Sequence, residues 1–213
     1  MNISETVQDS YSKGWFSIDG IMTQQNLNIV DAFKDLFLDK KPEKILEIGS
    51  QSGGLTLCLG YILNSLGMND VYVESYDVKD ISGSKYVSEK FKNIQFKIDN
   101  LFSDSYLELN PNKKEYVSEF FNSTKPIIVL CDGGSKRNEF NILSNFLRSG
   151  DVIMAHDYSP NHEYFTTVTK PSGVWQWHEI CDNDVKGCME RNNLSFFMHE
   201  KFKNAAWLCT VKN

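Results

Sequence analysis

The chain has 213 residues, of which 41% are hydrophobic and 23% are charged. These values are typical of a globular protein and exclude disorder, a collagen-like structure and a coiled coil. The 22 basic and 28 acidic residues give a net charge of −6. The chain as a whole therefore repels nucleic-acid phosphates and anionic lipid, and we expect neither nucleic acid nor a membrane as a partner.

The first half of the chain predicts helices that alternate with short buried strands. Apolar residues at helical spacing, followed by a basic turn and Pro42, predict a helix over about 24–39. We expect residues 1–40 as a whole to form a helical lid segment. A second helix covers 55–66 and ends at Gly67. Short apolar runs on either side of it predict three strands, which cover 44–48, 71–76 and 94–98.

The second half continues the alternation and ends differently. A helix over 115–121 precedes the most apolar run, 126–131, which is typical of a strand covered on both faces of a parallel sheet. The next helix ends at Gly150, and 152–155 predicts a fifth strand. After a helix over 175–189 we expect an antiparallel hairpin, because its two strands lie too close together for a crossover helix. These strands cover 194–199 and 205–211.

These elements predict an α/β fold, a doubly wound and mostly parallel seven-stranded sheet with a C-terminal antiparallel hairpin. No repeat, low-complexity tract or linker divides the sequence, so we expect a single domain over 1–213 with its core over 44–213. The N-terminus carries neither region of a secretory signal peptide, and the five cysteines form no Cys-x-x-Cys pair. We therefore expect a cytoplasmic protein without a disulfide framework or a structural zinc site.

Polar residues gather at the carboxyl ends of the predicted strands, where open α/β sheets bind their ligands. The first strand runs into a glycine-rich turn, residues 47–54, whose backbone can pass close to a ligand. This turn matches neither the Gly-x-Gly-x-x-Gly of dinucleotide folds nor a P-loop, which disfavours phosphate binding. Asp77 ends the second strand and can accept both ribose hydroxyls, while Asp99 ends the third and can face an adenine amino group. Together they favour a nucleoside without phosphate.

Several of these residues together resemble a known family. Glu47-x-Gly49-x-x-x-Gly53, the acidic end of the second strand, the segment 98–100 and the final hairpin are similar to class I S-adenosylmethionine-dependent methyltransferases. The resemblance implies a Rossmann-like methyltransferase fold with S-adenosylmethionine as cofactor. In that family the glycine loop holds the methionine part and the acidic residue holds the ribose. The cofactor residues implied here are Glu47, Gly49, Ser50, Gly53, Asp77 and Asp99.

A narrower resemblance concerns the fourth and fifth strands. Residues 45–54, 129–132 and 150–157 resemble the cephalosporin hydroxylase-like and macrolide sugar O-methyltransferase group, whose members hold a divalent cation with residues after these strands. The positions implied here are Asp132, His156 and Asp157. Because the two strands should be neighbours, these side chains can converge on one point. We expect Mg²⁺ or Mn²⁺ as the cation, although the histidine nitrogen moves the preference away from Mg²⁺ toward Mn²⁺, Fe²⁺ or Zn²⁺. The structural alternative is that Asp132 caps the next helix and the other two are ordinary strand-end residues.

The catalytic residues are predicted to be Asp132 and Lys136. Related enzymes place a histidine or lysine three residues after the strand-four aspartate, but Ser135 stands there, so the next residue is the candidate general base. That role requires a lysine pKa near neutrality. His162 and His178 are alternatives. In the family the N-terminal segment and the loop after strand five cover the acceptor site; the corresponding ranges are 13–25 and 158–176.

We therefore expect a metal-assisted O-methyltransferase that acts on a small hydroxylated acceptor, such as a sugar or a natural-product intermediate. One alternative is a methyltransferase that works through positioning and a protein base, without a metal. Another is a catalytically silent, nucleoside-binding regulatory or scaffold protein with the same fold. A homo-oligomer is compatible with each of these hypotheses.

Overall fold

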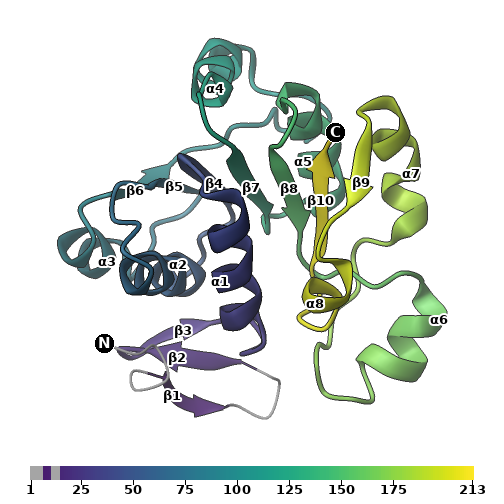
Figure 1. Cartoon of the computed structure of the whole chain (residues 1–213), viewed down its shortest axis with the longest axis horizontal. Helices are drawn as coiled ribbons and strands as arrows, with labels where there is room; N and C mark the ends of the chain where they lie inside the picture. The colour runs from purple at the N-terminus through teal and green to yellow at the C-terminus, as the bar shows by residue number, and fades with distance from the viewer. Residues whose placement is uncertain (1–6, 11–14) are drawn as a thin grey trace.

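Seven strands form the central sheet of the computed structural model, which describes residues 7–10 and 15–213. The strand order is β6-β5-β4-β7-β8-β10-β9 (Figure 1). The strands are β4 (Lys44–Ile48), β5 (Tyr72–Asp77), β6 (Ile94–Ile98), β7 (Ile127–Cys131), β8 (Val152–Ala155), β9 (Leu194–Phe196) and β10 (Leu208–Lys212). Strands β4 to β8 pair in parallel, and β10 is antiparallel to both β8 and β9. The predicted fold class is confirmed.

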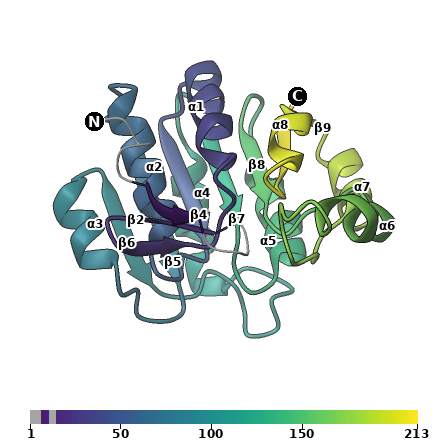
Figure 2. The same cartoon turned by 90° about the horizontal axis from the view of Figure 1, so that it is seen from below.

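Helices cover both faces of the sheet because its central strands are apolar on both sides. Ile128 and Leu130 of β7 pack in one core cluster, whereas Ile127 and Val129 pack in the other, as side-chain alternation along a strand requires. Helices α1 and α2 lie side by side (Figure 2) and contribute side chains to the first cluster. The longer helices are α1 (Ile29–Lys40), α2 (Gly54–Ser65), α3 (Ser84–Lys90), α4 (Lys114–Phe121), α5 (Lys136–Leu143) and α7 (Asp182–Arg191). Helices α4, α5 and α7 contribute to the second cluster.

The direction of chain progression reverses between β4 and β7, which are neighbours in the sheet. From β4 the chain moves outward to β5 and β6, and it then returns to β7 and continues to β8 on the other side. Loops after β4 and β7 therefore leave the sheet in opposite directions and open a crevice at the carboxyl ends of these strands. Every predicted site residue lies within or directly beside this edge.

The N-terminal segment differs from the predicted helical lid. Strands β1 (Val7–Ser10), β2 (Phe16–Ile18) and β3 (Ile21–Thr23) form a separate antiparallel sheet, which packs against α2. Only α1 within residues 1–40 is helical among the described residues; residues 1–6 and 11–14 lie outside them. The reason is local, because Asp19 and Gly20 both have positive φ and form the two-residue turn that joins β2 to β3.

Two C-terminal boundaries also differ from the prediction. The helix expected from residue 175 begins only at Asp182, since Ile180 forms an isolated bridge with Tyr158 and holds the preceding loop against the sheet. The hairpin strands are shorter than expected and flank the short helix α8 (His199–Lys203), but their antiparallel pairing is confirmed. In the described part of the chain, no helix is long and apolar enough to cross a membrane.

Candidate functional site

A cavity of about 340 Å³ opens at the carboxyl ends of β4, β5, β7 and β8. Most of the predicted site residues line it. These are Gly49, Ser50, Asp77, Asp99, Asp132, Lys136, His156 and Asp157. Glu47 and Gly53, which were predicted with them, are not part of its wall. One cavity therefore brings together the residues predicted for the cofactor and those predicted for the cation.

The glycine-rich turn after β4 lies close to backbone on two sides. A Cβ atom on Gly49, whose φ is +91°, would lie 2.2 Å from the carbonyl oxygen of Asp132. A Cβ atom on Gly54 would lie 2.0 Å from the carbonyl oxygen of Met22 in β3. The amides of Gly49 and Ser50 both donate to the carbonyl of Tyr76. The turn thus joins β4, β5, β7 and the N-terminal sheet, and only glycine fits at its two points of closest approach.

The two aspartates that follow β5 and β6 differ in their surroundings. Asp77 accepts hydrogen bonds from the backbone amides of Gln51 (2.7 Å) and Lys79 (3.1 Å), so its carboxylate is fixed beside the glycine turn. Asp99 forms an ion pair with Lys113, and the hydrogen bond from this lysine lowers the pKa of the Asp99 carboxyl. The Asp99 carboxylate is therefore already partly used by a protein cation, whereas Asp77 retains acceptor capacity toward the cavity.

Glu47 lies beneath the glycine turn. It is fully buried, and its Oε2 accepts hydrogen bonds from the hydroxyls of Thr56 and Ser75. Its Oε1 has no hydrogen-bond partner among the described residues. Burial raises the pKa of this carboxyl to about 7, although the two hydroxyl donors act in the opposite direction. In this position Glu47 holds α2 and β5 to the end of β4 from below the cavity.

The raised pKa of Glu47 predicts a pH dependence of stability. Between pH 4.5 and about 7 the folded chain binds this proton more tightly than the unfolded chain, so the free energy of unfolding should fall as the pH rises. Glu47→Gln should make this slope shallower by up to about one proton equivalent. Urea unfolding at a series of pH values measures it, with the exposed Glu89→Gln as control. An unchanged slope in Glu47→Gln would contradict the prediction.

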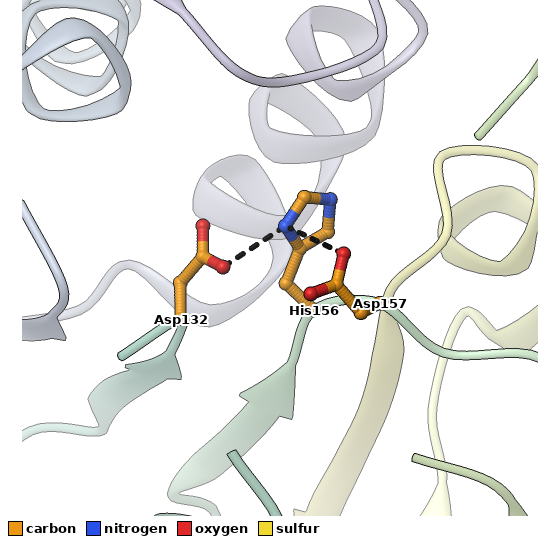
Figure 3. A group of neighbouring side chains, drawn as sticks. All are labelled: Asp132, His156 and Asp157. Carbon is orange, nitrogen blue, oxygen red and sulfur yellow. Dashed lines mark hydrogen bonds and ion pairs between the residues drawn. The ribbon is translucent and has the colours of Figure 1, made fainter. Parts of the chain in front are cut away.

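Three side chains at the ends of β7 and β8 converge on one point (Figure 3). His156 Nδ1 lies 3.0 Å from Asp132 Oδ1 and 3.8 Å from Asp157 Oδ1. His156 continues from β8, and Asp157 follows it in the left-handed region with φ +57°, a conformation that is rare for residues other than glycine. Both residues are almost fully buried, whereas Asp132 is partly exposed to the cavity.

The donor set fits a divalent cation. Around a six-coordinate Mg²⁺ or Mn²⁺, neighbouring ligand atoms are about 3 Å apart. The distance from His156 to Asp132 is 3.0 Å, the distance from His156 to Asp157 is 3.8 Å, and the three ligand atoms lie within 4.8 Å of one another. Two carboxylates and one imidazole on one side leave further positions open for other ligands. Burial acts to raise the pKa of Asp157, but His156 and Lys136 outweigh it and lower that pKa, so the carboxylate is in the form that binds cations.

Lys136 does not have the surroundings of a general base. Its side chain is buried, and its Nζ lies 2.9 Å from Asp157 Oδ2 and 3.2 Å from Glu179 Oε2. Burial alone would lower the pKa of this ammonium, but the carboxylates of Asp132, Asp157 and Glu179 outweigh it and raise the pKa above its ordinary value. A general base needs the opposite shift. The surrounding carboxylates thus favour the protonated form of Lys136, which is the opposite of what the predicted role as a general base requires.

Among known proteins, similarity to this chain was found in solved structures and not in sequence families. No protein-family model matches the sequence, and no curated protein matches it significantly. Among solved structures, CmcI without ligand is similar with a TM-score of 0.61 and 15% identity, over 92% of this chain and 75% of that chain. CmcI with magnesium and S-adenosylmethionine has a TM-score of 0.58 and 15% identity, and the match covers 91% of this chain and 75% of that chain. An S-adenosylmethionine-dependent O-methyltransferase from Thermotoga maritima has a TM-score of 0.51 and 11% identity, and the match covers 88% of this chain and 65% of that chain.

This chain has the class I S-adenosylmethionine-dependent methyltransferase fold. Both segments that were predicted to cover the acceptor side of such a fold line the cavity. Met22, Gln24 and Gln25 come from the N-terminal segment and Trp175 from the loop after β8, whereas Trp177 and Glu179 also line the cavity but lie just beyond the predicted range. His162 and His178, the alternative bases, stack on each other with ring centroids 5.7 Å apart and are not part of the described cavity wall.

Gln25 lies at the end of the predicted segment 13–25, but its role beside the candidate cation site was not predicted. Trp207 Nε1 donates to its Oε1 at 2.8 Å, which turns the amide nitrogen toward the candidate cation site. Gln25 Nε2 donates to Asp132 Oδ2 at 2.8 Å and lies 3.4 Å from His156 Nδ1. Trp175 Nε1 also donates to Asp157 Oδ1. These contacts orient all three candidate ligands, and no local sequence pattern marks the residues that make them.

Proposed function

We propose that this chain is an S-adenosylmethionine-dependent O-methyltransferase that uses a divalent cation and acts on a small hydroxylated acceptor. The observation that supports it best is the joining of two sets of residues in one cavity of about 340 Å³. The glycine turn and Asp77 lie at one end, and the convergent donors of β7 and β8 lie at the other. A cofactor and an acceptor bound there would lie next to each other, which transfer between them requires.

The nucleoside end is built for hydroxyl and backbone contacts. Asp77 is held by the amides of Gln51 and Lys79, and its remaining lone pairs can accept the two hydroxyls of a ribose. Gly49 lets the turn pass close to a ligand because it has no side chain. The absence of a phosphate-binding pattern in residues 47–54 is consistent with a nucleoside that carries no phosphate.

The acceptor end supplies a cation site and apolar surface. Asp132, His156 and Asp157 would hold the cation. When bound, S-adenosylmethionine supplies an electrophilic methyl group, and a divalent cation lowers the pKa of a hydroxyl and fixes its position. Gln25 and Trp175 orient the carboxylates of Asp132 and Asp157, respectively. Trp177, which also lines the cavity and is exposed, would give a ring-shaped acceptor an apolar surface.

Calorimetric titration of S-adenosylhomocysteine into the chelator-treated protein tests the cofactor assignment. We expect stoichiometric binding, with no binding of NAD and much weaker binding to Asp77→Ala, which loses the ribose acceptor. Methyl transfer to a panel of hydroxylated acceptors, with and without Mn²⁺, tests the reaction. Binding without transfer to any acceptor would favour a regulatory nucleoside-binding protein, and no binding would contradict the proposal as a whole.

A further inference from the structure

Lys136 places a positive charge beside the candidate cation site. Its Nζ lies 2.9 Å from Asp157 Oδ2 and 3.8 Å from Asp132 Oδ1, so it approaches two of the three candidate ligands. The lysine side chain is only 8% exposed, and water therefore screens these interactions weakly. Any divalent cation bound by these carboxylates would share them with a fixed ammonium group.

Two further oxygen atoms hold the ammonium in place. It donates to the carbonyl of Gly133 at 3.1 Å and lies 3.2 Å from Glu179 Oε2. Glu179 is not among the candidate ligands, and its side chain is 48% exposed. The ammonium therefore keeps partners that do not depend on Asp132 or Asp157. It can remain beside the site when these carboxylates bind a cation.

We propose that Lys136 is an internal counter-ion that weakens divalent-cation binding at this site and makes it readily reversible. Without a cation, its charge balances the two neighbouring carboxylates of Asp132 and Asp157, whose other hydrogen-bond donors, Gln25 and Trp175, carry no charge. With a cation, the two positive charges repel each other at short range in a medium less polar than water. Lys136 is thus a residue that sets cation affinity. The inference rests on the cation site of the proposed function.

A purely electrostatic effect makes a specific prediction about different ions. The repulsion depends on the charge of the bound ion and hardly on its identity, whereas a change in the ligands alters preferences between ions. Removing the ammonium should therefore strengthen the binding of Mg²⁺ and Mn²⁺ by similar factors. The ratio of the two affinities should stay near its wild-type value.

Calorimetric titration of Mg²⁺ and Mn²⁺ into the chelator-treated full chain tests the proposal. Lys136→Met removes the charge but keeps most of the side-chain length, and we expect both affinities to rise at least about tenfold. Lys136→Arg keeps the charge and should retain the weak binding. The matched control is Lys201→Met, which changes the net charge equally but removes an exposed partner of Asp35. Its affinities should equal those of the wild type.

Lys136→Met removes the cationic partner of two largely buried carboxylates, and the variant can fail to fold. Lys136→Gln provides the second test, because it keeps an N–H donor for the Gly133 carbonyl without the charge, and thermal unfolding reports whether each variant is folded. Unchanged or weaker cation binding in the neutral variants would overturn the proposal. Binding seen only in the neutral variants would support it. If no form binds a cation, this inference and the cation site fail together, while S-adenosylhomocysteine binding in chelator still tests the cofactor site separately.

Discussion

Asp132→Asn should abolish most cation-dependent methyl transfer while leaving S-adenosylhomocysteine binding in chelator unchanged. The variant keeps the shape of the side chain but removes the charge of the candidate ligand that faces the cavity. Because cation activation of an acceptor hydroxyl contributes several kcal/mol to the rate, we expect a loss of about a thousandfold. Mn²⁺ affinity should fall at least about a hundredfold.

Two measurements separate this role from a general loss of charge. Asp104→Asn changes the net charge equally on an exposed loop and should leave the transfer rate and Mn²⁺ affinity at wild-type values. Transfer rates of wild type and Asp132→Asn are then compared in chelator and at saturating Mn²⁺. Equal rates for both proteins, with no stimulation by Mn²⁺, would contradict the cation role and favour a methyltransferase that works through positioning alone.

Gly49→Ala should destabilise the chain by about 3 kcal/mol and weaken S-adenosylhomocysteine binding about a hundredfold, because two costs combine. The backbone has φ +91°, and the new Cβ atom would lie 2.2 Å from the carbonyl oxygen of Asp132. To relieve this contact the turn must move away from the end of β7. That movement displaces both the nucleoside loop and a candidate cation ligand. Urea unfolding and calorimetry measure the two effects.

Gly67→Ala is the matched control for this substitution. Gly67 also has a positive φ, +70°, but a Cβ atom there would meet nothing within 4 Å among the described residues. It should lose only the backbone preference of glycine, about 1 kcal/mol, and bind S-adenosylhomocysteine as the wild type does. If the two variants behave alike, the close approach between Gly49 and Asp132 is not what makes the turn specific.

The sheet and the location of the site followed from local signals. The strands predicted over 44–48, 94–98 and 152–155 have the same bounds in the structure. A strand covered by helices needs a continuous apolar run, and the polar residue that ends it marks its carboxyl end. Since parallel strands end at one edge, Asp77, Asp132 and His156 were expected together, and the cavity contains all three.

The N-terminal hairpin and the start of α7 were predicted incorrectly, the first because of a local turn signal and the second because of pairing between distant residues. The Asp19-Gly20 pair is a recognisable hairpin signal, but a helical segment was predicted over this region. The boundary of α7 was different, because the bridge between Ile180 and Tyr158 holds the chain extended before Asp182. Apolar periodicity describes one element at a time and cannot report such pairing.

The fold class, the glycine-rich turn after the first strand and the three convergent donors could be predicted from local sequence patterns. What surrounds those donors depends on contacts between distant parts of the chain. Lys136 is four residues from Asp132 and was predicted to be a general base, but Asp157 and Glu179 lie beside its ammonium and raise its pKa. Gln25 reaches Asp132 across 107 residues. A pKa and a hydrogen-bond direction depend on distances and burial in space, and residues far apart in the chain set both.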